Sequence, residues 1–223
     1  MKQKRTQENK KQLTEIVFIL DASGSMHGLE SDTIGGFNSM LDKQKKISGE
    51  AYVSTVLFDD ESKVIHDRRP IQTIAPMTDR DYSVGGCTAL LDAVGGAIHH
   101  IGNVHKYARE EDRPYKTLFV IITDGYENAS REYTYDKVNH MITRQQEKYG
   151  WEFMFLGANI DAAKEATKYG IKKEMAVNFV CDRKGTALNY DAVSDAICCM
   201  RNAAPIGTAW RDKIDADYAR RRK

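Results

Sequence analysis

The 223-residue sequence has no long apolar run and no excess of either charge, and each absence excludes a class of protein. Its longest apolar runs are about five residues, far below the roughly 18 that a membrane-spanning helix needs. Its 33 basic and 32 acidic residues leave a formal charge of +1, so no global field attracts nucleic acid or a membrane surface. The polar, basic N-terminus lacks the apolar stretch of a secretory signal. We therefore expect a cytoplasmic protein.

Cysteine is also scarce, and its spacing argues against a zinc site. The four cysteines form no CxxC pair, and no histidine is placed to complete a site with them. We expect reduced, mostly buried thiols, as in other cytoplasmic proteins. A second metal site at His99, His100 and His105 is not expected, because adjacent residues on a helix point apart.

Short apolar runs alternate with longer segments of helical spacing along the whole chain. This alternation predicts an α/β domain over 13–203, with a Rossmann-like, doubly wound, mostly parallel six-stranded sheet and helices on both faces. A hairpin turn at Asp59–Glu61 adds one antiparallel edge strand. We expect a flexible basic arm over 1–12 and a solvated basic tail over 204–223. The expected strands are 15–20, 51–58, 62–66, 117–123, 152–156 and 176–181, and the expected helices are 33–46, 89–100, 135–149, 162–169 and 187–202.

The most informative segment is IVFILDASGSM, residues 16–26. Five apolar residues run directly into Asp21, Ser23 and Ser25. A buried strand followed by oxygen side chains at every second position places those oxygens in one loop at the strand's carboxyl end. Such a loop can hold a hard divalent cation.

Two later segments supply further oxygen ligands. Thr88 follows a Gly-Gly-Cys sequence and opens a helical pattern, and Asp124 ends a second buried strand. In open parallel sheets, sites form outside the carboxyl ends of the strands. If the strands that end in Asp21 and Asp124 are neighbours, their carboxylates meet across one crevice.

The DxSxS sequence at 21–25, together with Thr88 and Asp124, resembles in order and context the metal-ion-dependent adhesion site (MIDAS) of von Willebrand factor A (vWA) domains. The chain resembles an intracellular, stand-alone member of this family over 13–203. The resemblance implies Mg2+, with Mn2+ or Ca2+ as alternatives. It also implies an adaptor whose ion takes an Asp or Glu from a protein partner; the oligomeric state stays open. The implied metal ligands are Asp21, Ser23, Ser25, Thr88 and Asp124, with the hydroxyls binding directly and the aspartates largely through water.

The rim of this site is the expected partner surface. Tyr126, Tyr133 and Tyr135 are candidate anchors there, since tyrosine is favoured at binding hot spots, although at least one of them is expected to pack under the third helix. The other expected rim segments are His27–Gly28, 79–84, 126–131 and 159–161.

Three alternative interpretations stay open. The serine and aspartate side chains can instead cap helix N-termini without a metal. A strand-end aspartate beside magnesium also suits a phosphate-ester hydrolase, but the second aspartate expected two positions on is Ser23, and phosphate-loop and GxSxG motifs are absent. The basic arm and tail motivate a nucleic-acid-associated module, whose binding should fall with salt. We expect no catalytic residue, no cofactor other than the ion and no membrane partner.

Overall fold

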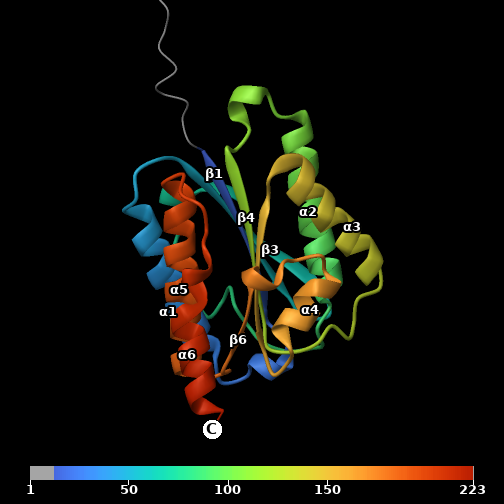
Figure 1. Cartoon of the computed structure of the whole chain (residues 1–223), viewed down its shortest axis with the longest axis vertical. Helices are drawn as coiled ribbons and strands as arrows, with labels where there is room; N and C mark the ends of the chain where they lie inside the picture. The colour runs from blue at the N-terminus through green and yellow to red at the C-terminus, as the bar shows by residue number, and fades with distance from the viewer. Residues whose placement is uncertain (1–12, 223) are drawn as a thin grey trace, which may run out of the picture.

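The computed structural model describes residues 13–222, which form one six-stranded sheet in the order β3-β2-β1-β4-β5-β6 (Figure 1). Neighbouring strands are parallel, except that β3 runs antiparallel to β2 at one edge. The predicted α/β sheet with one antiparallel edge strand is therefore confirmed. The strands are β1 (Thr14–Asp21), β2 (Ala51–Phe58), β3 (Ser62–Pro70), β4 (Lys116–Thr123), β5 (Glu152–Ala158) and β6 (Ala176–Phe179).

Helices cover both faces of the sheet, as Figure 1 shows. Alternate residues of β1 point to opposite faces: Phe18 packs with α1 and α5, whereas Ile19 packs with α2 and α3. Phe18 meets Phe37 of α1 edge to face, with ring centroids 5.3 Å apart. Two apolar cores therefore hold the sheet between two helical layers. One layer contains α1 (Glu30–Lys45), α5 (Arg183–Arg201) and α6 (Asp212–Arg221), and the other contains α2 (Leu90–Tyr107), α3 (Tyr135–Tyr149) and α4 (Ala162–Lys168).

The segment expected as a solvated tail is folded as far as the described chain extends. Residues 208–211 form a 3-10 turn and α6 follows it. Trp210 and Ile214 are buried in the core on the α1 and α5 side of the sheet. The sequence prediction was wrong here because two apolar side chains are enough to dock an otherwise polar helix. The arm over 1–12 and Lys223 lie outside the described residues.

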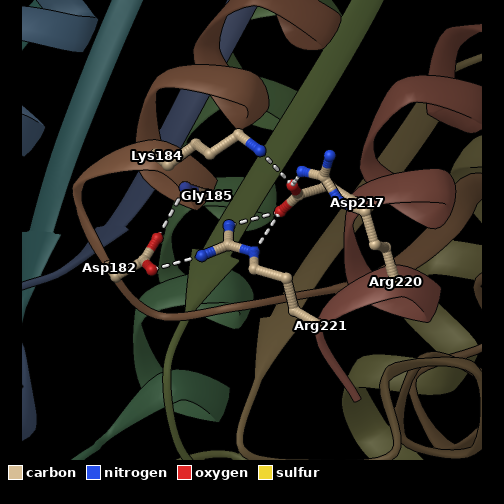
Figure 2. A network of polar contacts seen from close by, with 6 residues as sticks. All are labelled: Asp182, Lys184, Gly185, Asp217, Arg220 and Arg221. Atoms are coloured by element: carbon tan, nitrogen blue, oxygen red, sulfur yellow. Dashed lines mark hydrogen bonds and ion pairs between the residues drawn. The ribbon is translucent and has the colours of Figure 1, made fainter. Parts of the chain in front are cut away.

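The basic residues of α6 are paired within the chain rather than free for a partner (Figure 2). Asp217 accepts hydrogen bonds from Lys184 Nζ at 2.5 Å, Arg221 Nε at 2.6 Å and Arg220 Nη2 at 3.0 Å. Arg221 also pairs with Asp182, the N-cap residue of α5. This network pins the end of α6 to the start of α5.

Several boundaries differ from the sequence prediction for local reasons. Helix α5 begins four residues early because the Asp182 side chain accepts a hydrogen bond from Gly185 N at 2.8 Å. Helix α2 extends to Tyr107 because buried Ile101 continues its apolar stripe. The cysteines are less buried than expected, since Cys87 and Cys199 are exposed. No helix within residues 13–222 is long and apolar enough to cross a membrane.

Candidate metal centre

Asp21 and Asp124 lie side by side at the carboxyl edge of the sheet. Asp21 is the last residue of β1, and Asp124 directly follows β4, the parallel neighbour of β1. The strand order reverses between these two strands, which is where open α/β sheets form their sites. Both carboxylates are almost fully buried, with exposures of 1% and 2%. The topology therefore brings together two acids that are about a hundred residues apart in sequence.

A chain of short hydrogen bonds joins these acids through the two serines. Asp21 Oδ1 accepts from the Ser23 amide at 2.8 Å. The Ser23 and Ser25 hydroxyls are 3.0 Å apart, and Ser25 Oγ donates to Asp124 Oδ1 at 2.5 Å. Ser23 is buried, whereas Ser25 is exposed. The cluster is thus anchored inside the protein and open to solvent on one side.

Thr88 lies next to this cluster, and two hydrogen bonds join its backbone to Asn128. The Thr88 amide donates to Asn128 Oδ1 at 2.9 Å, and the Asn128 amide donates to the Thr88 carbonyl at 3.0 Å. A Cβ placed on Gly125 would lie 4.0 Å from Thr88 Oγ1, so the hydroxyl stands beside the residue that follows Asp124. All five sequence-predicted residues therefore gather at one edge.

The sequence analysis missed the residues that position Asp21. Thr123 Oγ1 donates to Asp21 Oδ2 at 2.6 Å, and Tyr82 OH donates to the Asp21 carbonyl at 2.5 Å. Tyr82 was expected on the exposed rim but is only 1% exposed. An aromatic residue inside an otherwise polar loop was the available signal for this role. Both contacts fix the end of β1 in place.

Asp124 has its own supporting contacts from the loops that follow β5 and β6. Asn159 Nδ2 donates to the Asp124 carbonyl at 3.1 Å, and Cys181 Sγ lies 3.7 Å from Asp124 Oδ2. Burial, followed by the charge of Asp124, raises the pKa of the Cys181 thiol to about 12. Cys181 therefore stays a neutral thiol that can donate to the carboxylate.

The electrostatics of the cluster favour a bound cation. Burial raises the pKa of Asp21 above its ordinary value, and the charge of Asp124 adds to this effect. Hydrogen bonds from Ser23 and Thr123 act in the opposite direction and favour the charged form. Two desolvated carboxylates at one edge are stabilised by a positive ion placed between them.

The donor atoms are oxygens, the kind that hard divalent ions such as magnesium bind. Mg2+ binds oxygen at about 2.0–2.1 Å in an octahedron, which places adjacent ligand oxygens about 2.9 Å apart. The Ser23–Ser25 and Ser25–Asp124 oxygen pairs are 3.0 and 2.5 Å apart. Residues 13–222 contain no group of three His, Cys, Asp or Glu side chains placed to hold a metal. The candidate centre therefore combines two carboxylates with hydroxyls, and magnesium commonly uses only one or two carboxylates.

The helix-capping interpretation does not agree with the structure. Ser23 is the N-cap of the 3-10 turn Gly24–Met26 but makes no side-chain capping hydrogen bond. The N-cap residues of α1 and α2 are Leu29 and Ala89, and neither has a side-chain cap. The serine and aspartate oxygens are therefore directed to one another rather than to helix ends.

Within the described chain, the hydrogen-bond partners of the two serines include no histidine or lysine. The Ser23 and Ser25 hydroxyls contact each other and the Asp124 carboxylate. Nearby His27 is exposed and pairs with Glu30 of α1 at 3.3 Å. These contacts differ from the serine–histidine pair that commonly activates a serine nucleophile.

Of the three tyrosines expected as interface anchors, only Tyr126 is strongly exposed. Its exposure is 50%, whereas Tyr133 and Tyr135 pack against the core on the α2 and α3 side. Tyr135 OH also donates to Glu165 at 2.5 Å. Tyr126 is therefore the aromatic side chain that a partner at this edge can reach.

Comparison with known proteins agrees with this fold. No family model matches the sequence, and no curated protein matches it either. Among solved structures, proximal thread matrix protein 1 from the mussel byssus aligns over 85% of this chain, with a TM-score of 0.56 and 15% identity. A vWA protein from Catenulispora acidiphila aligns over 83%, with a TM-score of 0.52 and 14% identity. The chain therefore has the α/β fold of vWA domains.

Two further matches extend the comparison. The D319A mutant of the PilB minor pilin from Streptococcus sanguinis aligns over 86% of this chain, with a TM-score of 0.59 and 12% identity. Another structure of the mussel protein, described as having a zinc-occupied MIDAS motif, has a TM-score of 0.57 and 16% identity. This chain spans 47% of the mussel protein, 62% of the pilin and 42% of the Catenulispora protein.

Proposed function

We propose that this protein is a metal-dependent protein–protein interaction module, an adaptor that uses a bound Mg2+ to take a carboxylate from a protein partner. The ion is held by Asp21, Ser23, Ser25, Thr88 and Asp124. Mn2+ and Ca2+ are alternative occupants, and the cytoplasmic location stays a prediction of the sequence. The mussel relative with a zinc-occupied MIDAS motif supports a divalent ion at the corresponding edge of this fold.

The observation that carries the proposal is the hydrogen-bonded chain of oxygens from Asp21 to Asp124 at the switch point of the sheet. Three of its members are buried, and Ser25 alone is exposed. An ion held there is bound from the protein side and has its remaining positions toward solvent. A partner can approach only from that side.

The composition of the cluster explains why a partner carboxylate is the expected ligand. Serine and threonine hydroxyls are neutral, so a cation that they bind directly, with the aspartates acting largely through water, keeps much of its positive charge. Replacement of a bound water by an Asp or Glu side chain then neutralises charge at a site with few anionic ligands. Exposed Tyr126 supplies ring area at the same edge.

The test is an affinity capture from native cell extract with the chain immobilised. Wild type in magnesium is compared with wild type in EDTA and with Asp124→Ala in magnesium. Asp195→Ala is the matched control, because it removes an exposed carboxylate from α5 that pairs only with Lys213. We expect one protein to be retained by wild type and the control and lost in the other two samples. Equal retention in all samples would contradict metal-bridged recognition.

A phosphatase assay on the same samples separates this proposal from the hydrolase alternative. We expect no magnesium-dependent turnover of p-nitrophenyl phosphate, because Ser23 stands where a phosphate-ester hydrolase of this kind has its second aspartate. Turnover that requires magnesium and disappears in Asp21→Asn would instead favour a phosphate-ester hydrolase.

A further inference from the structure

A sizeable cavity lies far from the candidate metal centre, at the opposite end of the sheet. Its volume is about 630 Å3, and it opens between the C-terminal halves of α2 and α3 beside the start of β5. We call it the basic cavity. Its cationic lining residues are Lys106, Arg113, Arg144 and Lys148, joined by His99, His105 and His140.

No acidic residue lines the basic cavity. The cationic lining residues are also unpaired: within residues 13–222, none of the four Lys and Arg side chains forms an ion pair with a carboxylate. Lys106 and Lys148 instead lie over the rings of neighbouring tyrosines, and Arg113 Nε donates to the Ala108 carbonyl. In a chain with nearly equal numbers of acids and bases, this local excess of positive charge is not a compositional accident.

Spacing on the helices concentrates these charges on facing surfaces. His140, Arg144 and Lys148 follow one another at intervals of four residues on α3, so they share one side of the helix. Arg144 and Lys148 repel each other, because like charges at this spacing destabilise a helix. An anion bound between them removes that repulsion.

Helix-end electrostatics account for only part of this charge. Lys106 and Lys148 lie in the last turns of α2 and α3, where cations offset the negative end of the helix dipole. Arg144 lies before the last turn of α3, and Arg113 lies in the loop before β4. Neither Arg144 nor Arg113 offsets a helix dipole, and both are exposed residues of the cavity wall.

Beneath the cavity, the buried acid Glu15 already has its partners. Glu15 of β1 is fully buried and binds Arg68 Nε at 2.6 Å and His105 Nε2 at 2.5 Å. His105 is therefore held by the protein interior, whereas the remaining cations are available to a ligand. Residues 1–12 contain five Lys or Arg and a single Glu, so that segment is itself strongly basic.

The rest of the lining is apolar or aromatic. Ile98, Met141, Pro114 and the edge of Trp151 form part of the wall, and Tyr149 at the mouth is 53% exposed. Gly102 of α2 also lines the cavity, and a Cβ there would make an ordinary contact with Gln145 of α3 at 3.5 Å. Ligand pockets typically have volumes of about 300–1,000 Å3 and combine apolar walls with a few polar groups.

We propose that the basic cavity binds a phosphorylated small molecule with a ring or apolar body, about the size of a mononucleotide. The phosphates lie among Lys106, Arg113, Arg144 and Lys148, and the body lies against the apolar wall and the Tyr149 ring. This site is separate from the candidate metal centre and uses none of its residues.

The test is calorimetric titration of the full chain with ADP, adenosine and pyrophosphate in EDTA, so that the metal centre takes no part. We expect ADP to bind more tightly than either fragment. Arg144→Gln/Lys148→Gln should weaken ADP binding at least tenfold, since it removes two of the four fixed charges. Lys43→Gln/Lys46→Gln on α1 is the matched control: it makes the same charge change on the other helical layer and should bind ADP like wild type.

Other outcomes would overturn the proposal. These are no binding of ADP at millimolar concentration, ADP binding that the cavity variant does not weaken, and pyrophosphate binding as tightly as ADP. Tighter binding of a short single-stranded RNA than of ADP would replace the small molecule with a nucleic acid. Asp124→Ala should bind ADP like wild type, because Asp124 does not line the basic cavity. The ADP proposal can therefore fail without the adaptor proposal failing, and the reverse also holds.

Discussion

At the carboxyl ends of β1 and β4, oxygen side chains hydrogen-bond one another in a buried cluster. At the opposite end of the same sheet, cationic side chains line a cavity without acidic partners. The first region is organised before any ligand arrives, because Thr123, Tyr82 and the serines position the acids. The second region has charge and space but few internal contacts. One mostly parallel sheet therefore carries a pre-organised oxygen cluster at one end and an open basic cavity at the other.

The packing of α2 on its neighbours shows the same contrast. Near the metal centre, a Cβ on Gly95 would lie 2.2 Å from the ring of Tyr133, so the helix is in close contact there. Two turns later, a Cβ on Gly102 would meet only Gln145 at 3.5 Å. One helix is tightly packed at the metal end and loosely packed at the cavity end.

The largest expected effect is on metal affinity. Asp21→Ala and Asp124→Ala should each weaken Mn2+ binding by at least about 100-fold, because each removes one of the two buried carboxylates. Titration of the protein with Mn2+, followed by electron paramagnetic resonance, measures this loss. Asp195→Ala and Arg144→Gln/Lys148→Gln should bind Mn2+ like wild type. Metal binding that survives in both aspartate variants would place the ion elsewhere.

The next effect compares two glycines of one helix. Gly95→Ala should lower the free energy of unfolding by about 1–3 kcal/mol, because the new methyl overlaps the Tyr133 ring. Gly102→Ala should instead raise it by up to about 1 kcal/mol, since alanine favours helix and its Cβ makes an ordinary contact. Urea unfolding of both variants measures the difference. If both variants changed the free energy of unfolding in the same direction, the two ends of α2 would be packed alike.

Acid should weaken the attachment of α6 to the start of α5, which lies at the carboxyl edge of the sheet. Lys184, followed by Arg221 and Arg220, lowers the pKa of Asp217 to about 2, below its ordinary value. The stabilisation that ionised Asp217 contributes is therefore complete above about pH 4 and is lost as the pH falls from about 4 to 2. Acid unfolding of wild type and Asp217→Asn should converge in that interval and differ at neutral pH. A constant difference from neutral pH down to pH 2 would show that the Asp217 charge does not stabilise α6.

The smallest effect tests the repulsion at the cavity. Arg144→Gln should raise the free energy of unfolding by about 0.2–0.5 kcal/mol in the absence of a ligand, because it removes the repulsion with Lys148 and leaves Lys148 in place at the helix end. Lys43→Gln/Lys46→Gln should give no such gain, since Lys43 pairs with Asp191 and supports the end of α1. Urea unfolding at low salt measures both. A loss of stability in Arg144→Gln would mean that Arg144 has a structural partner.

Much of the fold and of the metal centre could be predicted from sequence, because both depend on local pattern. The five-residue runs 16–20 and 118–122, which lead to Asp21 and Asp124, are apolar at every position, which is typical of strands covered on both faces. Ser23, Ser25 and Thr88 each stand next to a strand or helix signal. By contrast, Tyr82 and the α6 segment were misjudged, since burial of an aromatic residue in a polar loop, or of a helix with few apolar residues, depends on distant partners.

The sequence by itself determined the strand and helix alternation, the antiparallel edge strand and the identity of the five oxygen-bearing residues. Hydrophobic periodicity and strand-end position are properties of neighbouring residues, so they can be seen without coordinates. Only the tertiary structure decided that β1 and β4 are adjacent, that Thr123 and Tyr82 hold Asp21, and that α6 is pinned through Asp217. It alone joined the cations of α2, α3 and the loop before β4 into one cavity. These features depend on contacts between residues far apart in the chain, which are established only when the helices pack on the sheet.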